Sequence, residues 1–146
     1  MTTFSTAVCV KHSPEEMYAL VNDVESYPGY IPMCTEVRLI RRDEDSLTAR
    51  ISLAKGKIKL GFTTQNWMVP GQRIDMRLVD GPFKRLNGTW TFKPEGDHGC
   101  EVRLSMDFEF ANALLGLAFG PFFKEVTEAM VEAFSKQAAV KYGAKP

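Results

Sequence analysis

Residues 100–110 alternate strictly between apolar and polar side chains. Cys100, Val102, Leu104, Met106, Phe108 and Phe110 are separated by Glu101, Arg103, Ser105, Asp107 and Glu109. Successive side chains of a β-strand point to opposite faces, so this pattern predicts a long strand with one buried face and one solvated face. Such a strand needs paired neighbours, because unpaired backbone groups are costly when they are buried. The chain is therefore expected to build an antiparallel sheet with one covered face.

Three earlier segments repeat the alternation and supply the neighbouring strands. Their apolar positions are Leu47, Ala49, Ile51 and Leu53, then Ile58, Leu60 and Phe62, then Ile74, Met76 and Leu78. Residues typical of turns separate the strands at 43–46, 55–57, 70–71, 80–82 and 95–99. The order predicts a series of sequential hairpins.

A helix is predicted near each end of the chain. Ser13, Pro14 and Glu16 provide the N-cap, the first-turn proline and the capping box of the first helix. The second helix, over about 121–142, has an apolar stripe formed by Phe122, Val126, Met130, Ala133 and Phe134. Gly120 and Pro121 leave two alternatives open, a helix that starts there or a longer helix with a kink. We therefore expect an α+β fold, a curved antiparallel sheet around a long C-terminal helix.

Composition and charge limit the classes of function. Lys plus Arg equals Asp plus Glu at 18 each, so no net charge draws the chain to nucleic acid, and DNA is not expected as a partner. Cys9, Cys34 and Cys100 are too far apart to indicate a disulfide framework or a metal site. The chain has neither a signal-peptide pattern nor about 18 consecutive apolar residues. We expect one cytoplasmic domain over residues 1–146.

No motif for catalysis is found. His12 lies beside a helix cap and His98 in a polar turn, and both are interpreted as exposed turn residues. Cys34 has no histidine near it in the sequence and is interpreted as a small buried residue. The chain is therefore not expected to be an enzyme, and no catalytic residue or cofactor is predicted.

Large, soft side chains are abundant, with 10 Phe, 7 Met and 2 Trp. A long helix on a curved sheet encloses a space that side chains fill or a ligand occupies, and composition does not separate these alternatives. The candidates to line it are Met33, Phe62, Trp67, Met76, Trp90, Phe92, Met106 and Phe108. The uncharged segment 111–123 is either core at the start of a helix or a gate for an apolar ligand at a membrane surface.

Cations gather around one predicted hairpin. Lys55, Lys57 and Lys59 lie at its tip, and Arg41, Arg42 and Arg50 lie on strands near it. A solvated hairpin explains them, and the alternative is a patch that contacts RNA phosphates. Because no aromatic stacking motif for single-stranded RNA is found, such contact would use shape and charge.

Four strings of residues resemble a known family. They are SPEEMY at 13–18, DVESYPGYIPMC at 23–34, GPFKRLNGTW at 81–90 and MVEAF at 130–134. The chain resembles the coenzyme Q-binding/RatA (ribosome-association toxin) family of the START-like (polyketide cyclase/lipid transport) superfamily. Met33 replaces the usual Trp of the second string, and Tyr30 replaces the usual Phe.

The resemblance implies a helix-grip fold over residues 1–146 and non-enzymatic binding of a hydrophobic molecule. The ligand implied is ubiquinone or a related prenyl lipid, held between the sheet and the C-terminal helix in support of respiration. The ligand-binding residues expected are Tyr27, Pro28, Met33, Cys34, Trp67, Met76, Trp90, Leu114, Leu115, Phe119 and Phe122.

Two alternatives stay open. The first is a toxin of the toxin–antitoxin type that binds the large ribosomal subunit and blocks subunit association, with Lys55, Lys57 and Lys59 as its contacts. The second, weaker one is a polyketide cyclase-like enzyme that uses the same cavity. The expected partners are thus a prenylquinone, the large ribosomal subunit and, in transient contact, the surface of the inner membrane.

Overall fold

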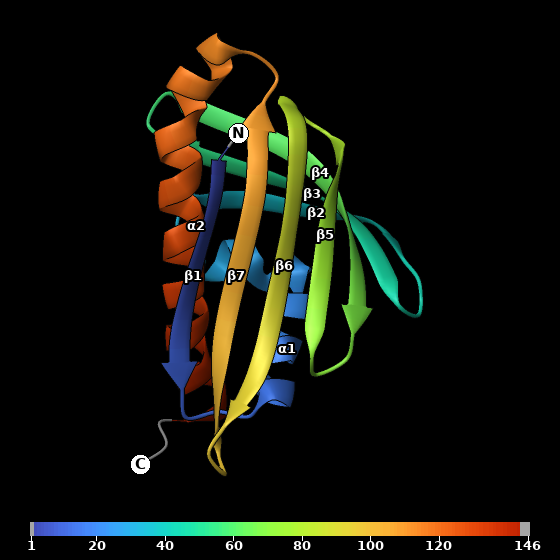
Figure 1. Cartoon of the computed structure of the whole chain (residues 1–146), viewed down its shortest axis with the longest axis vertical. Helices are drawn as coiled ribbons and strands as arrows, with labels where there is room; N and C mark the ends of the chain where they lie inside the picture. The colour runs from blue at the N-terminus through green and yellow to red at the C-terminus, as the bar shows by residue number, and fades with distance from the viewer. Residues whose placement is uncertain (1, 144–146) are drawn as a thin grey trace.

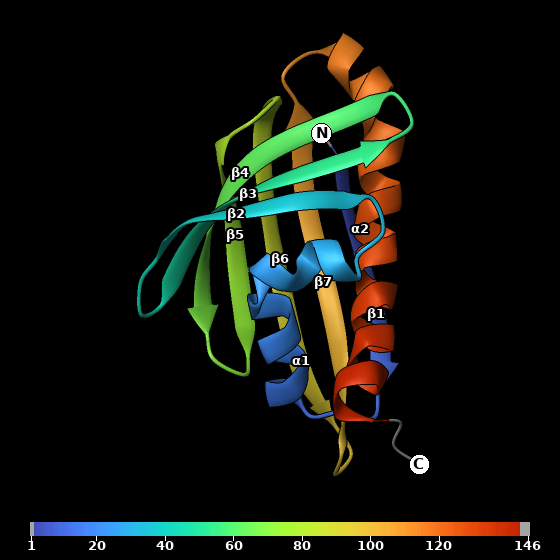
Figure 2. The ribbon, with the colours of Figure 1, turned by 180° about the vertical axis from the view of Figure 1, so that it is seen from behind.

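The computed structural model describes residues 2–143 and consists of a curved sheet with helices on its concave side (Figures 1 and 2). In chain order the elements are β1 (Thr2–Val10), α1 (Pro14–Asn22), the 3-10 helix η1 (Val24–Gly29), β2 (Cys34–Arg42), β3 (Ser46–Lys55), β4 (Ile58–Val69), β5 (Arg73–Asp80), β6 (Phe83–Glu95), β7 (Gly99–Phe110) and α2 (Ala113–Tyr142). The expected combination of a curved antiparallel sheet and a long C-terminal helix is confirmed.

The sheet has the strand order β1-β7-β6-β5-β4-β3-β2, and its neighbouring strands are antiparallel. Strands β2 to β7 form the predicted series of hairpins, and β1 joins the far edge by pairing with β7, with Phe4 opposite Met106. The helix α2 packs against β1 and β7, and α1 packs against β6 and β7 (Figure 2). A closed space is thus left between the concave face of the sheet and α2.

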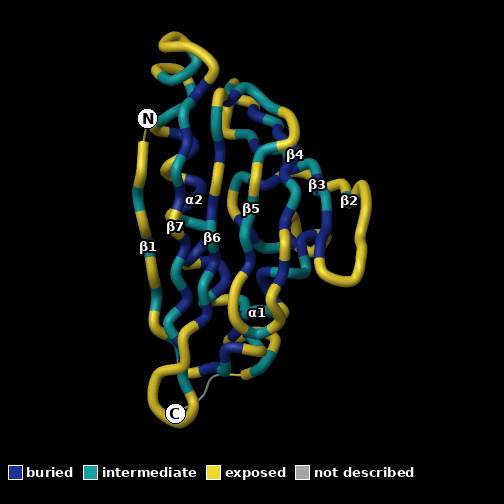
Figure 3. Tube along the Cα trace, turned by 45° about the vertical axis from the view of Figure 1, so that its right-hand side comes forward, coloured by how far each residue is buried: buried dark blue, intermediate teal, exposed yellow. Residues whose placement is uncertain are grey.

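The alternation of side chains decides which of them face this space. All six apolar residues of β7 from Cys100 to Phe110 are buried, as predicted. On β4 the even-numbered residues Leu60, Phe62, Thr64, Asn66 and Met68 are buried, which places two polar side chains in the interior. Figure 3 shows buried and more exposed positions alternating along the strands.

The first helix begins with the predicted capping box, and the second begins earlier than residue 121, at a cap that was not predicted. At α1 the Glu16 backbone N–H donates to Ser13 Oγ at 3.1 Å, and the Ser13 N–H donates to Glu16 Oε1 at 3.0 Å. The helix α2 begins at Ala113, where Asn112 Oδ1 accepts from the Leu115 N–H at 2.9 Å. Pro121 therefore lies inside the helix, and the alternative of a longer helix holds.

Phe134 is one of the buried aromatic residues through which α2 packs on the rest of the molecule. Phe134 is fully buried, and its ring centroid lies 5.4 Å from that of Tyr27, 5.8 Å from Tyr30 and 5.3 Å from Trp90. These edge-to-face contacts join α2 to η1 and β6. The segment of the DVESYPGYIPMC string thus packs directly on the C-terminal helix.

The interpretation of His12 as an exposed residue was wrong. Its side chain is only 5% exposed, and its Nε2 lies 3.0 Å from the carbonyl oxygen of Gly143. The Tyr142 hydroxyl donates to the Glu16 carbonyl at 3.2 Å beside it. His12 is therefore buried by the end of α2, a contact between residues 131 positions apart in the chain.

Candidate functional site

A cavity of about 50 Å³ lies between the sheet and α2. Its lining comes from η1, from strands β3 to β7 and from α2. The residues are Val24, Tyr27, Ala49, Ile51, Leu53, Phe62, Thr64, Asn66, Met76, Leu86, Gly88, Trp90, Leu104, Met106, Phe123, Val126, Thr127 and Met130. Most of them are apolar, so the cavity favours apolar groups.

Three polar side chains interrupt this apolar lining, and the sequence analysis missed them. The Thr64 hydroxyl donates to Asn66 Oδ1 at 3.0 Å, and the Thr127 hydroxyl donates to the carbonyl of Lys124 at 2.9 Å. Asn66 Nδ2 donates to no acceptor in residues 2–143. Because Asn66 lines the cavity and its Nδ2 has no acceptor among the described residues, the cavity offers one unused hydrogen-bond donor to a ligand.

Methionines form the adjustable part of the wall. A Cβ atom at Gly88 would lie 2.6 Å from Met76 Cε and 2.7 Å from Met106 Sδ, so the tips of these two side chains occupy the space above the glycine. Met130 lines the cavity from α2. Methionine side chains are unbranched and adapt to new shapes. The cavity can therefore widen by rotation of side chains.

Three of the predicted ligand-binding residues line the cavity, namely Tyr27, Met76 and Trp90. The Tyr27 hydroxyl donates to the carbonyl of Val21, and burial raises the pKa of Tyr27 well above its usual value. Tyr27 therefore stays protonated and cannot act as a base near neutral pH. Its ring forms part of the wall, and its hydrogen bond fixes the position of η1.

Other predicted residues of the same string lie outside the cavity lining. Pro28 is exposed, and Met33 is half-buried with a positive φ of 68°. Cys34 is buried beside the cavity residues without lining the cavity, and burial raises its pKa to about 11. The string therefore positions Tyr27 and packs on α2, while most of its members do not face the cavity.

Trp67 was wrongly placed among the residues that line the interior. Its side chain is 40% exposed and points to the outer face of the sheet. The reason is its odd position in β4, where Asn66 and Met68 on either side take the inner face. The size of an indole favours the interior, but the position of Trp67 in the strand decides its face.

The predicted ligand-binding residues at the start of α2 do not line the cavity, and the exposure of this end fits the alternative of a gate better than that of core. Leu114 is 75% exposed, Leu115 and Phe119 are half-buried, and Phe122 is buried without lining the cavity. Phe123 and the residues one turn later take its place in the wall. Figure 3 shows the first turns of α2 as a largely exposed end of the helix. This end lies beside a second hollow of about 640 Å³, where Gly116 and Pro121 face Phe110.

The three hairpin lysines do not form one free patch. Lys55 Nζ lies 2.7 Å from a carboxylate oxygen of Glu125, and this ion pair joins the β3–β4 hairpin to α2. Lys57 and Lys59 are exposed, and neither has an ion pair within residues 2–143.

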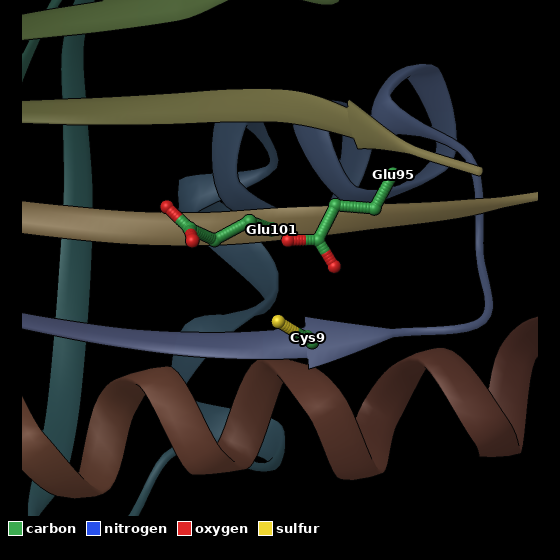
Figure 4. Close-up of side chains that lie close together, drawn as sticks. All are labelled: Cys9, Glu95 and Glu101. Carbon is green, nitrogen blue, oxygen red and sulfur yellow. The ribbon is translucent and has the colours of Figure 1, made fainter.

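One group of side chains has donor atoms close enough together for a metal ion. Atoms of Cys9, Glu95 and Glu101 lie within 4.8 Å of one another on the outer face of the sheet (Figure 4). Glu101 is already paired with Arg103 at 3.0 Å. A hydrogen bond with Glu95 raises the pKa of the Cys9 thiol, which disfavours the thiolate that a metal would need. These contacts account for the group without an ion.

The chain matches a known protein family and is similar in sequence to named proteins. The family described as polyketide cyclase / dehydrase and lipid transport matches residues 10–135. The chain is 43% identical over 145 residues to the ribosome association toxin RatA of Escherichia coli (strain K12), covering 99% of this chain and 92% of that protein. It is 28% identical over 145 residues to the mitochondrial coenzyme Q-binding protein COQ10 homolog B of Xenopus laevis, covering 96% of this chain and 59% of that one.

A solved structure shows the same fold at low sequence identity. The ZhuI aromatase/cyclase from Streptomyces sp. R1128 superposes with a TM-score of 0.81 at 17% identity, over 99% of both chains. Within the part of the chain that the structure describes, no helix is long and apolar enough to cross a membrane. From the family match over residues 10–135, its fold and its 43% identity to RatA, the chain belongs to the coenzyme Q-binding/RatA family of the START-like (polyketide cyclase/lipid transport) superfamily.

Proposed function

We propose that the protein binds a prenylquinone or a similar lipid in the cavity between the sheet and α2, and thereby supports respiration. The observation that carries this proposal is the apolar cavity with one unused hydrogen-bond donor, Asn66 Nδ2. A quinone ring presents carbonyl acceptors and no donors, so its chemistry complements this amide. Ubiquinone is the leading candidate, and the likeness to a coenzyme Q-binding protein supports it.

Binding requires the cavity to widen. An apolar cavity of about 150 Å³ is known to bind benzene, and the volume here is about 50 Å³. Rotation of Met76, Met106 and Met130 enlarges the space without breaking a hydrogen bond, because thioethers make only weak ones. The methionine wall is thus the part of the site that moves.

The start of α2 is the proposed entrance. Leu114 and Leu117 are 75% and 81% exposed, and the segment 111–123 contains no charged residue. Exposed leucines at this density are suited to transient contact with a lipid surface. A prenyl lipid would pass from a bilayer along this end of the helix.

The test is to purify the protein from a respiring bacterial host and to identify bound lipids by mass spectrometry. Wild type is expected to carry prenylquinone, and Ala49→Leu, which fills the cavity from β3, is expected to lose it. Ala54→Leu is the matched control, because this residue lies on the same strand and on the outer face. Thr64→Val should weaken retention at constant volume by removing the hydroxyl that orients Asn66. A wild-type protein free of lipid after native purification would overturn the proposal.

A second function is favoured by a specific observation, the 43% identity over 99% of this chain to a ribosome association toxin. We propose that the protein also binds the large ribosomal subunit and hinders subunit association. Co-sedimentation with purified large subunits, lost as salt is raised, would support it, because phosphate contacts release counterions. Absence of co-sedimentation at low salt would contradict it.

The proposal is for binding and not for catalysis. The aromatase/cyclase neighbour is 17% identical, so its likeness concerns the fold. The tyrosine of the cavity keeps its proton, and the other polar groups are an amide and hydroxyls engaged in hydrogen bonds. This set is suited to holding a ligand.

A further inference from the structure

The outer face of the sheet carries a hollow of its own, of about 640 Å³. It is lined by Trp67, Asp75, Met76, Arg77, Asn87, Gly88 and Thr89. The register explains this grouping, since Trp67 pairs with Asp75 and Asp75 with Thr89, while Arg77 pairs with Asn87. The hollow therefore lies across β4, β5 and β6, on the opposite side of the sheet from the cavity.

Some polar side chains of the hollow already make hydrogen bonds or ion pairs, and others make neither. Asp75 accepts from the Thr89 hydroxyl at 3.1 Å and pairs with Arg73 at 3.0 Å. Within residues 2–143, the side chains of Arg77 and Asn87 have neither a hydrogen bond nor an ion pair. The hollow thus presents a guanidinium, a primary amide and a 40% exposed indole.

This combination matches the chemistry of an unpaired nucleotide. An indole face stacks on a base, an amide bonds to the donor and acceptor groups of the base edge, and a guanidinium binds phosphate. The hollow has the size of a small-molecule site.

A pair of arginines extends the same face toward the edge of the sheet. Arg38 on β2 lies directly opposite Arg50 on β3, and neither has an ion pair within the described chain. Like charges in this position destabilise a sheet. A Cβ at Gly61 would lie 2.6 Å from Arg50 Nη2, so the glycine makes room for the guanidinium. An anion on this pair would remove the repulsion.

We infer that the outer face of β2–β6 binds RNA, with an unpaired nucleotide stacked on Trp67 and backbone phosphates on Arg38 and Arg50. The inference rests on the proposed ribosome association and names its contact surface. It differs from the hairpin hypothesis, because Lys55 is paired with Glu125 and the free arginines lie on the strands. In Figure 2 the strands β2, β3 and β4 lie at the front, and no helix covers them.

The test uses two probes, a short single-stranded oligoadenylate and protein-free large-subunit ribosomal RNA. Trp90 is buried, so quenching of the exposed Trp67 reports stacking directly. Loss of one stacked base is worth about 1–3 kcal/mol, so Trp67→Ala is expected to weaken binding of both probes by about 5- to 150-fold. Trp67→Phe should retain most of the affinity. Arg50→Ala should weaken binding and lower the salt slope by about one.

Lys93→Ala is the matched control, since it removes an exposed cation from the same sheet, and it should change affinity less than about twofold. Far-UV circular dichroism of each variant checks that the fold is intact. Unchanged RNA affinity of folded Trp67→Ala, or no quenching of wild type, would overturn the inference.

Co-sedimentation with intact large subunits separates this inference from the proposed function. If wild type and Trp67→Ala co-sediment equally, the ribosome association stands and the RNA face is wrong. If wild type does not co-sediment, the association fails, and the oligoadenylate measurement alone then supports or overturns the RNA face.

Discussion

Gly88 lines the cavity, and one added carbon atom there would take space that a ligand needs. A methyl group there would lie 2.6 Å from Met76 Cε and 2.7 Å from Met106 Sδ, and both tips would be pushed into the cavity. We expect Gly88→Ala to reduce retained prenylquinone at least tenfold and to lower the free energy of unfolding by about 1–3 kcal/mol. Urea unfolding and lipid extraction measure the two effects. Gly29→Ala is the control, because its Cβ would meet no atom within 4 Å. Equal lipid retention in both variants would contradict the role of the methionines.

The buried thiols make stability depend on alkaline pH. Burial raises the pKa of Cys34 to about 11 and that of Cys100 to about 12, from the usual 9.0. The unfolded chain therefore loses these protons first as pH rises, so the free energy of unfolding falls from about pH 9 upward, by at most about 1.4 kcal/mol per pH unit for each thiol. Urea unfolding between pH 8 and 10 should show this fall, and Cys34→Ala should make it shallower. A slope that Cys34→Ala leaves unchanged would exclude this thiol as a cause.

Single residues show where prediction from sequence succeeds and where it stops. The alternation of side chains along a strand predicted which residues of β7 are buried. The same rule applied to β4 places Trp67 on the outer face of the sheet and Asn66 on the inner face. The signal for Asn66 was thus present, in the form of a polar residue at a buried position. The burial of His12 had no such signal, because it depends on Gly143 at the far end of the chain.

At the scale of elements, the exposed end of α2 is expected to act in the uptake of lipid. Leu117 is 81% exposed, so Leu117→Asp should change the free energy of unfolding by less than about 0.5 kcal/mol. It should nevertheless slow the transfer of ubiquinone from phospholipid vesicles to the protein, because a charge opposes contact with the bilayer. Transfer is measured by pelleting the vesicles and assaying quinone in the supernatant. Val140→Asp, at a 77% exposed position near the other end of α2, is the control. Equal transfer rates for the two variants would place the entrance elsewhere.

Most helices and strands could be predicted from short-range patterns in the sequence. The capping box of α1 and the turns between strands are short-range features, and they appear where the sequence places them. The start of α2 was left open between Pro121 and an earlier residue, although Asn112 is a good N-cap residue. Proline is tolerated best in the first turn of a helix. Pro121 is instead an exposed residue inside α2, and the neighbouring Phe122 and Phe123 are buried.

At the scale of the whole molecule, the two proposed sites lie back to back. Met76 and Gly88 line both the internal cavity and the outer hollow, so one layer of β5 and β6 separates them. The back-to-back position of the two sites could not be predicted from the sequence, because it depends on the pairing of Met76 on β5 with Gly88 on β6. We therefore expect that a ligand that displaces Met76 on the cavity side changes the floor of the hollow on the outer side.

This arrangement predicts coupling between lipid and RNA. Widening the cavity should press the Met76–Gly88 backbone outward and make the hollow shallower, so a saturating short-chain quinone is expected to weaken RNA binding at least fivefold. Binding free energies are linked, so saturating RNA must weaken quinone binding by the same factor. Anisotropy of a labelled oligoadenylate measures the first factor, and equilibrium dialysis of the quinone measures the second. Ala49→Leu, with its cavity filled from β3, should bind RNA with an affinity that quinone does not change. RNA affinity that is the same with and without quinone in the wild type would show that the shared backbone is rigid and that the two sites act independently.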